Sequence, residues 1–388
     1  MARLGECFSI IRNGVSISQI DGASGIPITR IETISNCEID RNKFGYANIY
    51  DACKYKDYLL HDQDILMSHI NSEKHLGKVA IYHQLENEQI IHGMNLLMLR
   101  AKRDMIYPQY ATYYFQSSAF KRQIISITKK SVNQASFTVT ALKELDFPVP
   151  SLDMQVKIAA VLDKVSGLIA KRRQQLDKLD MLVKARFVEM FGTEAELDRW
   201  TCCTVGDVAD VCVGVVIKPT QYYTDRGVPA FRSLNIGEMY VKDASWVYFT
   251  EEGHRKNQKS VIHKNDVLVV RSGAPGTACV AKEKYEGYNA VDIIIAHPDN
   301  SKVNSVFLAA YTNMPHGMTQ IREKTGGAAQ QHFNVSGYKS MRLIMPPMAF
   351  QEKFAAFVAQ VDKSKLSIQK SYEKLETLKK ALLQKYFE

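Results

Sequence analysis

Two stretches of the chain repeat an apolar residue at every seventh position. They run from Ser151 to Gly192 and from Pro347 to Glu388, and good helix formers dominate both. In the second stretch the apolar column consists of Phe354, Val361, Ile368, Leu375 and Leu382. In the first stretch it consists of Leu162, Ile169, Leu176, Val183 and Met190. This periodicity predicts two long amphipathic helices.

A seven-residue repeat sustained over five positions is typical of a coiled-coil seam. We expect the first helix to offer Leu162, Ile169, Leu176 and Val183 to the second, which offers Phe354, Val361, Ile368 and Leu375. A helix from Gln155 to Phe191 is about 55 Å long, more than a domain of roughly 150 residues spans. The chain must leave the first domain along one helix and return along the other, so the pair is predicted to be antiparallel. The alternative is two separate helices, each lying on its own domain.

The two helical stretches align with each other without a gap. Each residue of the second lies 196 positions after its equivalent in the first; Gln351, for example, is equivalent to Gln155. The match continues upstream, where "FTVTALKELDFPVPSL" corresponds to "FNVSGYKSMRLIMPPM" and "GIPITRIETI" to "GVPAFRSLNI". These similarities predict an internal repeat. We expect globular domains at 1–148 and 193–345, and helical spacers at 149–192 and 346–388.

The predicted globular domains mix short strands with helices. Runs rich in β-branched and apolar residues, such as "DILMSHI", "DVLVVRS" and "VDIIIAHP", alternate with turn residues. Each domain also has a helical stretch, at Tyr107–Thr128 and at Asn304–Thr325. The expected fold class is α+β, with two globular domains separated by an antiparallel coiled coil and related by an internal pseudo-two-fold axis.

Composition narrows the class of protein. The chain has 388 residues, is 46% hydrophobic and carries a net charge of +9, which favours polyanionic partners. No apolar run is long enough for a membrane span, and no secretory signal is visible, so we expect a cytoplasmic protein. The seven cysteines lack metal-ligand spacing and are expected to be reduced, idle thiols.

No catalytic motif stands out in the chain. The glycines of "RSGAPGTACVAK" lack the GK[ST] of a phosphate-binding loop, and neither HExxH nor a dinucleotide-binding GxGxxG after a strand occurs. We therefore expect a protein that is not an enzyme, with no catalytic residues and no metal site.

Together these features resemble the specificity (S) subunit of type I restriction-modification systems. The resemblance covers essentially the whole chain and is carried by "FPVPSLDMQVKIAAVLD" with "LIMPPMAFQEKFAAFV", and by "KLDMLVKARFVEMFG" with "KLETLKKALLQKYFE". Two departures are mild: Val156 stands where the second copy has Glu352, and Met154 and Phe350 are apolar where this family often has Glu.

The resemblance implies a non-catalytic DNA-recognition subunit. Each globular domain would be a target-recognition domain that reads one half of a split double-stranded DNA sequence. The helices would set the spacer and dock two modification (methyltransferase) subunits, which restriction (translocase/nuclease) subunits then join. S-adenosylmethionine, ATP and Mg are expected only in those partner subunits, so the chain itself has no cofactor.

Side chains that suit DNA contacts occupy equivalent loops of the two domains. Arg30 and Arg232 follow the G-x-P turns, and Arg271 and Ser272 follow a strand at the position that Ser68 and His69 hold in the first copy. Two polar turns add Lys129, Lys130, Asn133, Gln134, Lys324, Gln330 and Gln331. Gln134 and Gln330 match although the domains should read different bases, which favours a structural or phosphate-facing role.

Two other interpretations fit parts of the pattern. One is a tandem protein–protein scaffold without a DNA role, which the basic charge and the divergence of the two domains disfavour. The other is a detached recognition module of a single-chain methyltransferase–nuclease, which would be expected to carry a long catalytic region beside it.

Overall fold

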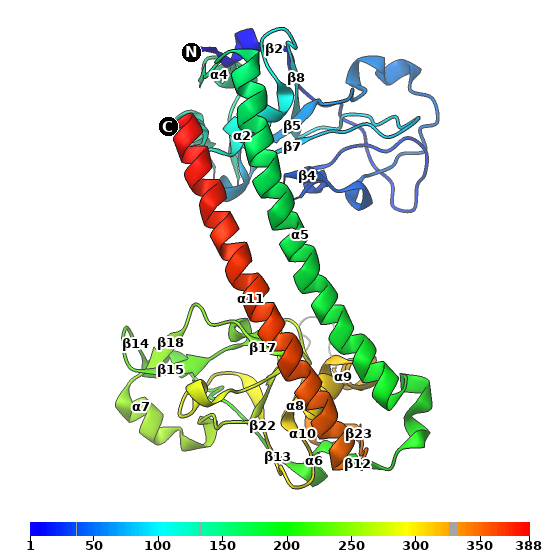
Figure 1. The fold of residues 1–388 in the computed structure, drawn as a ribbon, viewed down its shortest axis with the longest axis vertical. Coiled ribbons are helices and arrows are strands. Elements are labelled where there is room, and N and C mark those ends of the chain that lie inside the picture. Colours follow the sequence, from blue (N-terminus) through cyan, green and yellow to red (C-terminus); the bar gives the residue numbers. More distant parts are fainter. Residues whose placement is uncertain (36, 132–133, 326–331) are drawn as a thin grey trace. The chain divides into compact units, whose positions relative to one another are not determined.

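The computed structural model describes residues 1–35, 37–131, 134–325 and 332–388. By their contacts these residues form two compact units. Unit 1 comprises Met1–Arg173 and Lys370–Glu388, and unit 2 comprises Gln174–Gln369. Each unit therefore combines one globular part with parts of both long helices, α5 (Leu152–Phe191) and α11 (Met348–Phe387) (Figure 1). The prediction of an α+β fold with two globular parts and two long helices is confirmed.

Unit 1 is built on a four-stranded antiparallel sheet. Its order is β2 (Phe8–Asn13), β8 (Leu96–Ala101), β5 (Ile65–Ser68) and β7 (Val79–Ile81). Side chains alternate between the two faces, so Ile65 and Met67 join the core under α2 (Pro108–Gln116) and α3 (Ser118–Ile127). Leu66 faces the other way, into a second core covered by loop segments. Burial on both faces explains why β5 reads as a continuous apolar run.

Unit 2 repeats this strand order. Its sheet runs β13 (Ala209–Val213), β22 (Ile293–Pro298), β19 (Val267–Val270) and β20 (Ala278–Val280). Val267 and Val269 lie in the core that also contains residues of α8 (Ser305–Asn313) and α9 (Pro315–Lys324). Leu268 and Val270 lie in the core on the opposite face.

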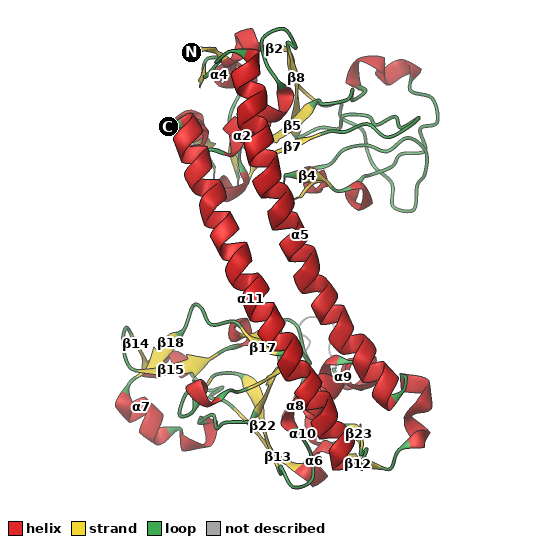
Figure 2. Cartoon of the chain, viewed as in Figure 1, coloured by secondary structure: helices red, strands yellow, loops and turns green. Residues whose placement is uncertain are grey.

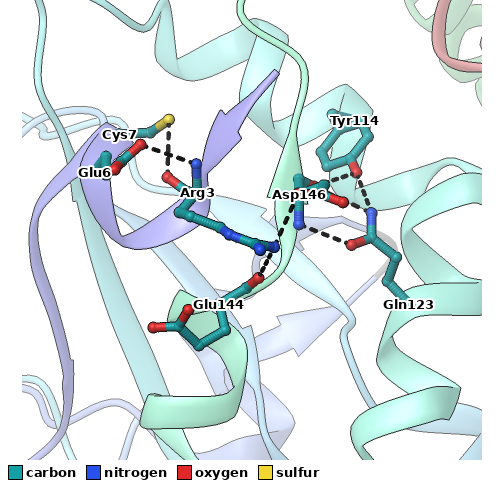
Figure 3. A network of polar contacts seen from close by, with 7 residues as sticks. All are labelled: Arg3, Glu6, Cys7, Tyr114, Gln123, Glu144 and Asp146. Carbon is teal, nitrogen blue, oxygen red and sulfur yellow. Dashed lines mark hydrogen bonds and ion pairs between the residues drawn. The ribbon is translucent and has the colours of Figure 1, made fainter.

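A hydrogen-bond network at the base of each globular part is repeated as well. In unit 1 the Asp146 backbone N–H donates to Gln123 Oε1 (2.9 Å), while the Tyr114 hydroxyl (2.9 Å) and Gln123 Nε2 (3.1 Å) donate to the Asp146 carbonyl (Figure 3). Nearby, Arg3 Nη1 donates to the Glu144 carbonyl (2.7 Å) (Figure 3). The network fixes the chain as it enters the proline-containing turn before α5.

The corresponding network of unit 2 uses Tyr311, Gln320 and Arg342. Tyr311 (3.0 Å) and Gln320 (3.0 Å) donate to the Arg342 carbonyl, and the Arg342 N–H donates to Gln320 Oε1 (2.7 Å). Burial raises the pKa of Tyr114 and of Tyr311 to about 12, so both phenols remain hydrogen-bond donors at neutral pH.

Short elements flank these networks in both units. In unit 1 they are β1 (Ala2–Arg3), α1 (Leu4–Cys7), α4 (Val139–Lys143) and β11 (Asp146–Phe147), with β1 paired to β11. In unit 2 they are β12 (Cys202–Thr204), α6 (Val205–Val208), α10 (Val335–Lys339) and β23 (Arg342–Ile344), with β12 paired to β23.

The units differ in their smaller sheets (Figure 2). Unit 1 has the pair β3 (Ile34–Ser35) and β4 (Glu38–Ile39), and a sheet of β6 (Ile70–Asn71), β10 (Ala135–Ser136) and β9 (Lys129–Lys130). Unit 2 has the pair β16 (Ile236–Gly237) and β17 (Tyr240–Val241), the helix α7 (Glu251–Lys256), and a sheet of β14 (Tyr223–Thr224), β18 (Val247–Phe249), β15 (Val228–Phe231) and β21 (Asn289–Ala290).

Both long helices contribute to the core of each unit. In unit 1 Ile158 and Leu162 of α5 belong to the core against which Leu383 and Phe387 of α11 pack. In unit 2 the Phe187 ring of α5 lies 5.4 Å from the Phe354 ring of α11. The start of α5 thus meets the end of α11 in unit 1, and the end of α5 meets the start of α11 in unit 2. The helices pack antiparallel in both units, and the alternative of one helix per domain does not describe this arrangement.

The predicted seam residues are all withdrawn from solvent to some degree. Leu162, Val183, Phe354 and Val361 are buried, whereas Ile169, Leu176, Ile368 and Leu375 are half-buried. Apolar side chains outside the seam, such as Leu168, Met181 and Leu366, are exposed. Burial is complete only where a globular part covers the helices.

Gln155 and Gln351 attach the helices to the globular parts. Gln155 is fully buried; its Oε1 accepts from the Tyr107 N–H (2.9 Å), and its Nε2 donates to the carbonyls of Met105 and Pro150 (2.9 Å each). Gln351 likewise accepts from the Asn304 N–H (2.9 Å) and donates to the Pro346 carbonyl (2.9 Å). Each glutamine satisfies backbone groups at the N-terminus of α2 or α8, which explains its repetition.

Candidate nucleic-acid interface

In unit 1 the small sheet brings two of the predicted contact loops together. Strand β10 pairs with both β9 and β6, so that Ala135 lies opposite Lys130 on one side and Asn71 on the other. The Phe137 N–H donates to the His69 carbonyl (3.2 Å). The segment that follows β5 and the strands β9 and β10, which are far apart from it in the sequence, therefore form one surface.

The residues of this surface differ in their access to solvent. Ser68 and His69 are only 2% and 7% exposed, and burial lowers the pKa of His69. Lys129, Lys130 and Gln134 are exposed, and Lys130 Nζ lies 2.9 Å from Glu73 Oε1. A buried side chain cannot reach a base edge or a phosphate, so we leave Ser68 and His69 out of the candidate interface.

The β5–β7 connection adds lysines that the sequence analysis did not select. It carries Lys74 and Lys78, both exposed. The pKa of His75, which lies between them, is lowered mainly by desolvation and further by these two positive charges. The ion pair between Lys130 and Glu73 places this connection beside β9. We call Lys74, Lys78, Lys129 and Lys130 the basic edge of unit 1. The signal in the sequence was a pair of lysines in the turn between two apolar strands, "SEKHLGK".

Unit 2 makes the same junction with different side chains. Ser272 forms a β-bridge with His332, and Ser272 Oγ lies 2.7 Å from His332 Nδ1. The Phe333 N–H donates to the Arg271 carbonyl (3.0 Å). Arg271 Nη1 donates to Asp292 Oδ1 (2.8 Å), and its side chain is 22% exposed. The predicted contacts Gln330 and Gln331, like Asn133 of unit 1, lie outside the described residues.

Arg30 and Arg232 occupy equivalent places, as the sequence alignment implied. Each precedes a single 3-10 turn, and their backbone N–H groups donate to Thr33 Oγ1 (2.8 Å) and Asn235 Oδ1 (2.9 Å). The Arg30 guanidinium is exposed, with Glu32 at 3.7 Å. Arg232 Nη2 instead donates to the Ser245 carbonyl (2.6 Å). Arg30 is therefore better placed than Arg232 to contact an anion.

Lys324 has a local structural partner. Its Nζ donates to the carbonyl and the hydroxyl of Ser340 (2.9 Å each), and desolvation lowers its pKa. The ammonium group thereby ties α9 to the end of α10. A lysine whose donors are used in this way contributes little to phosphate binding.

The described residues contain no group of three or more His, Cys, Asp or Glu side chains arranged to hold a metal ion. Within the same residues no helix is both long enough and apolar enough to span a bilayer.

Comparisons with known proteins follow the same division of the chain. The family model for the type I restriction modification DNA specificity domain matches residues 1–180 and again residues 198–380. A chain from Methanocaldococcus jannaschii, provisionally named the specificity subunit of the type I restriction enzyme MjaX, is 29% identical over 398 residues, covering 98% of this chain and 90% of that relative. The StySPI specificity subunit of Salmonella potsdam is 21% identical over 394 residues, covering 93% and 81%.

Solved structures share the fold. The S subunit of a type I restriction-modification system from M. genitalium matches with a TM-score of 0.52 at 13% identity, covering 100% of this chain and 95% of that chain. A chain from a study of complex assembly and conformational transition in the type I R-M system matches with a TM-score of 0.53 at 16% identity, covering 100% and 96%.

Proposed function

Because the chain belongs to the type I restriction-modification DNA specificity family, we propose that each of its units reads one half of a bipartite double-stranded DNA target. Membership of this family also confirms the prediction that the chain is a specificity subunit and not an enzyme. A tandem scaffold without a DNA role is correspondingly disfavoured.

One observation carries the proposal of two half-sites. The same sheet order recurs in both units, and the same junction lies beyond β5 in unit 1 and beyond β19 in unit 2. The side chains at that junction differ: lysines and Gln134 in unit 1, and Arg271, Ser272 and His332 in unit 2. One scaffold that carries two different polar surfaces suits the recognition of two different sequences.

Within unit 1 the basic edge would position the protein on the DNA backbone. Contacts to phosphates position a protein without reading sequence, whereas amide and guanidinium groups suit bidentate contacts to base edges. We assign phosphate contacts to Lys74, Lys78, Lys129 and Lys130, and we retain Arg30 and Gln134 as further candidates. In unit 2 we retain Arg271 and Ser272.

The long helices would set the spacer and dock two modification subunits. Each helix exposes large apolar side chains outside its seam: Val156, Val161 and Leu168 on α5, and Leu366 and Leu378 on α11. Large apolar side chains exposed on a helix suit contact with another protein. Restriction subunits would then join, and S-adenosylmethionine, ATP and Mg would enter with the partner subunits.

Exchange of one globular part tests the proposal. Residues 1–148 are replaced by the corresponding part of another family member, and adenine methylation is mapped across the genome of a host that also carries the partner subunits. We expect one half-site to change and the other to persist. The reciprocal exchange of 193–345 should change the other half-site. A change in both halves from one exchange, or methylation that is independent of this chain, would contradict the proposal.

A further inference from the structure

A thiol, an imidazole and a carboxylate lie in line on the main sheet of unit 2. Cys212 Sγ, on the edge strand β13, is 3.6 Å from Nε2 of His297 on the neighbouring strand β22. His297 Nδ1 is 2.7 Å from Oδ1 of Asp266. The Asp266 side chain is 4% exposed, and its Oδ2 accepts from the His263 N–H (2.6 Å). A nucleophile beside an imidazole that a buried carboxylate orients is the arrangement that activates nucleophilic side chains.

Unit 1 shows which part of this arrangement the fold requires. There Asp64 accepts from the His61 N–H (2.8 Å), just as Asp266 accepts from His263, but its partner is Arg100 (2.7 Å). The strand registers match, since Ile10 lies opposite Arg100 and Asp210 lies opposite His297. An arginine can therefore fulfil the structural role of His297. The imidazole, and the sulfur beside it, are features of unit 2 alone.

The position matching Cys212 in unit 1 has another use. By the same registers it is Arg12, which lies opposite Met98 as Cys212 lies opposite Ile295. The Arg12 guanidinium covers the Tyr58 ring at 4.5 Å and takes no part in the Asp64 pair. The fold therefore does not require a sulfur at this position, since unit 1 has an arginine there.

The hydrogen bonds of His297 to Asp266 and Cys212 determine its protonation state. Asp266 first, and then Cys212, raise the pKa of His297 to about 10, so the imidazole carries both protons at neutral pH. Its Nδ1–H donates to Asp266, and its Nε2–H is directed at the sulfur. The thiol of Cys212 donates to the Lys259 carbonyl (3.2 Å). A cationic N–H donor beside a sulfur favours the thiolate, which is the reactive form of cysteine.

The neighbouring charged groups have partners of their own and do not compete with Cys212 for the His297 Nε2–H. The His263 ring lies 5.9 Å from the His297 ring, and its Nδ1 is paired with Glu286 (2.8 Å). Asp210, opposite His297, is 3.7 Å from Lys339 Nζ. Cys212 is partly exposed and the His297 side chain is 30% exposed, so the cluster lies at the surface of unit 2. Cys7 and Cys279, in contrast, are buried.

We infer that Cys212, His297 and Asp266 form a reactive-thiol site that takes small electrophiles, namely alkylating agents and peroxides. The thiol proton leaves to solvent, and the His297 Nε2–H donates to the resulting thiolate. With iodoacetamide a sulfur–carbon bond forms and iodide leaves. With hydrogen peroxide the sulfur takes one oxygen, the O–O bond breaks and hydroxide leaves; the sulfur is oxidised by two electrons to a sulfenic acid as the peroxide is reduced. The inference does not depend on the proposed reading of DNA.

Limited alkylation of the full chain tests the site. Iodoacetamide is added at pH 7 together with glutathione, and the labelling of each cysteine is followed by peptide mass spectrometry. We expect Cys212 to react about tenfold faster than glutathione. His297→Gln should lower the Cys212 rate by about the same factor, and His263→Gln, which removes the neighbouring ring that does not touch the sulfur, should leave it unchanged.

A comparison of cysteines within the unaltered chain supplies a second measurement should His297→Gln fail to fold. The Cys212 rate should exceed the rates of the exposed Cys37, Cys53 and Cys202. Dimedone capture after peroxide treatment should mark Cys212 in the same samples. A Cys212 rate at or below that of glutathione, a rate at or below those of the exposed cysteines, or equal rates in the unaltered and His297→Gln chains would overturn the inference.

Discussion

Single side chains that look alike in the sequence have different roles in the fold. Lys324 and Lys129 are both predicted to lie in polar turns, but Lys324 ends α9 with its ammonium bonded to Ser340, whereas Lys129 is exposed on the edge strand β9. Arg30 and Arg232 both cap a 3-10 turn, but only the Arg232 guanidinium donates to a backbone carbonyl. Residue type predicted which side chains suit DNA. The partners of each side chain decide which of them are available.

Removal of two lysines from the basic edge should weaken DNA binding in a salt-dependent way. The change is Lys129→Ala with Lys130→Ala, assayed in the assembled complex. Each lost phosphate contact reduces the slope of log K against log salt by about 0.9, so the slope should fall by about 2. Binding to cognate and random DNA should weaken alike.

Lys302→Ala is the control for this pair, because that exposed lysine is paired with Asp299 (3.3 Å) and lies outside the candidate interface. An unchanged slope in the double variant would remove these lysines from the DNA surface.

Gln351→Ala should destabilise unit 2. The buried glutamine satisfies the Asn304 N–H and the Pro346 carbonyl, and leaving such groups unpaired costs about 1–3 kcal/mol each. Both tryptophans, Trp200 and Trp246, belong to unit 2, so their fluorescence during urea denaturation reports on this unit. Lys353→Ala, two residues along on the exposed face, should change the free energy of unfolding by no more than about 0.5 kcal/mol. Equal midpoints for the two variants would show that the glutamine bonds contribute nothing net.

At the scale of elements, the heptad columns predicted the helices and the side chains that they turn inward. They did not predict that burial along these columns is uneven. Val183 and Phe354 are buried where the globular part of unit 2 covers them, whereas Leu176, one heptad before Val183, and Ile368, two heptads after Phe354, are half-buried. A helix pair alone cannot bury its seam as completely as a helix pair covered by a sheet and further helices.

The end of α11 should be required for the stability of unit 1. Leu382, Leu383, Tyr386 and Phe387 pack on its core, and Glu388 bonds Ser118 and pairs with Arg122 (3.4 Å). A chain truncated after Gln369 should lose amide-exchange protection in α2 and α3, because their buried aromatic side chains lose these partners. Protection in β19 and β22 of unit 2 should persist. Retained protection in α2 would show that the end of α11 is dispensable.

At the scale of the whole molecule, the proposed function treats the helices as the element that sets the distance between half-sites. Insertion of one heptad after Arg173 in α5 and another after Gln369 in α11 adds about 10 Å to each helix and keeps the seam in register. The preferred spacer should lengthen by about three base pairs, at roughly 3.4 Å each.

Methylation of a library of targets with different spacers measures the outcome. Insertion into one helix alone is the matched control, and it should impair assembly because the facing seams no longer align. A doubly inserted chain that keeps the original spacer would remove the helices from that role.

The sequence by itself determined the internal repeat, the two long helices and the α+β character, because periodicity and composition can be read from the order of residues alone. Only the tertiary structure decided which residues of these patterns come into contact. It paired β6, just after β5, with β10, buried Ser68 and His69 beside that pairing, and placed Cys212 beside His297. Such pairings connect residues tens of positions apart, and only the closed sheet, with its fixed register, specifies which of them come into contact.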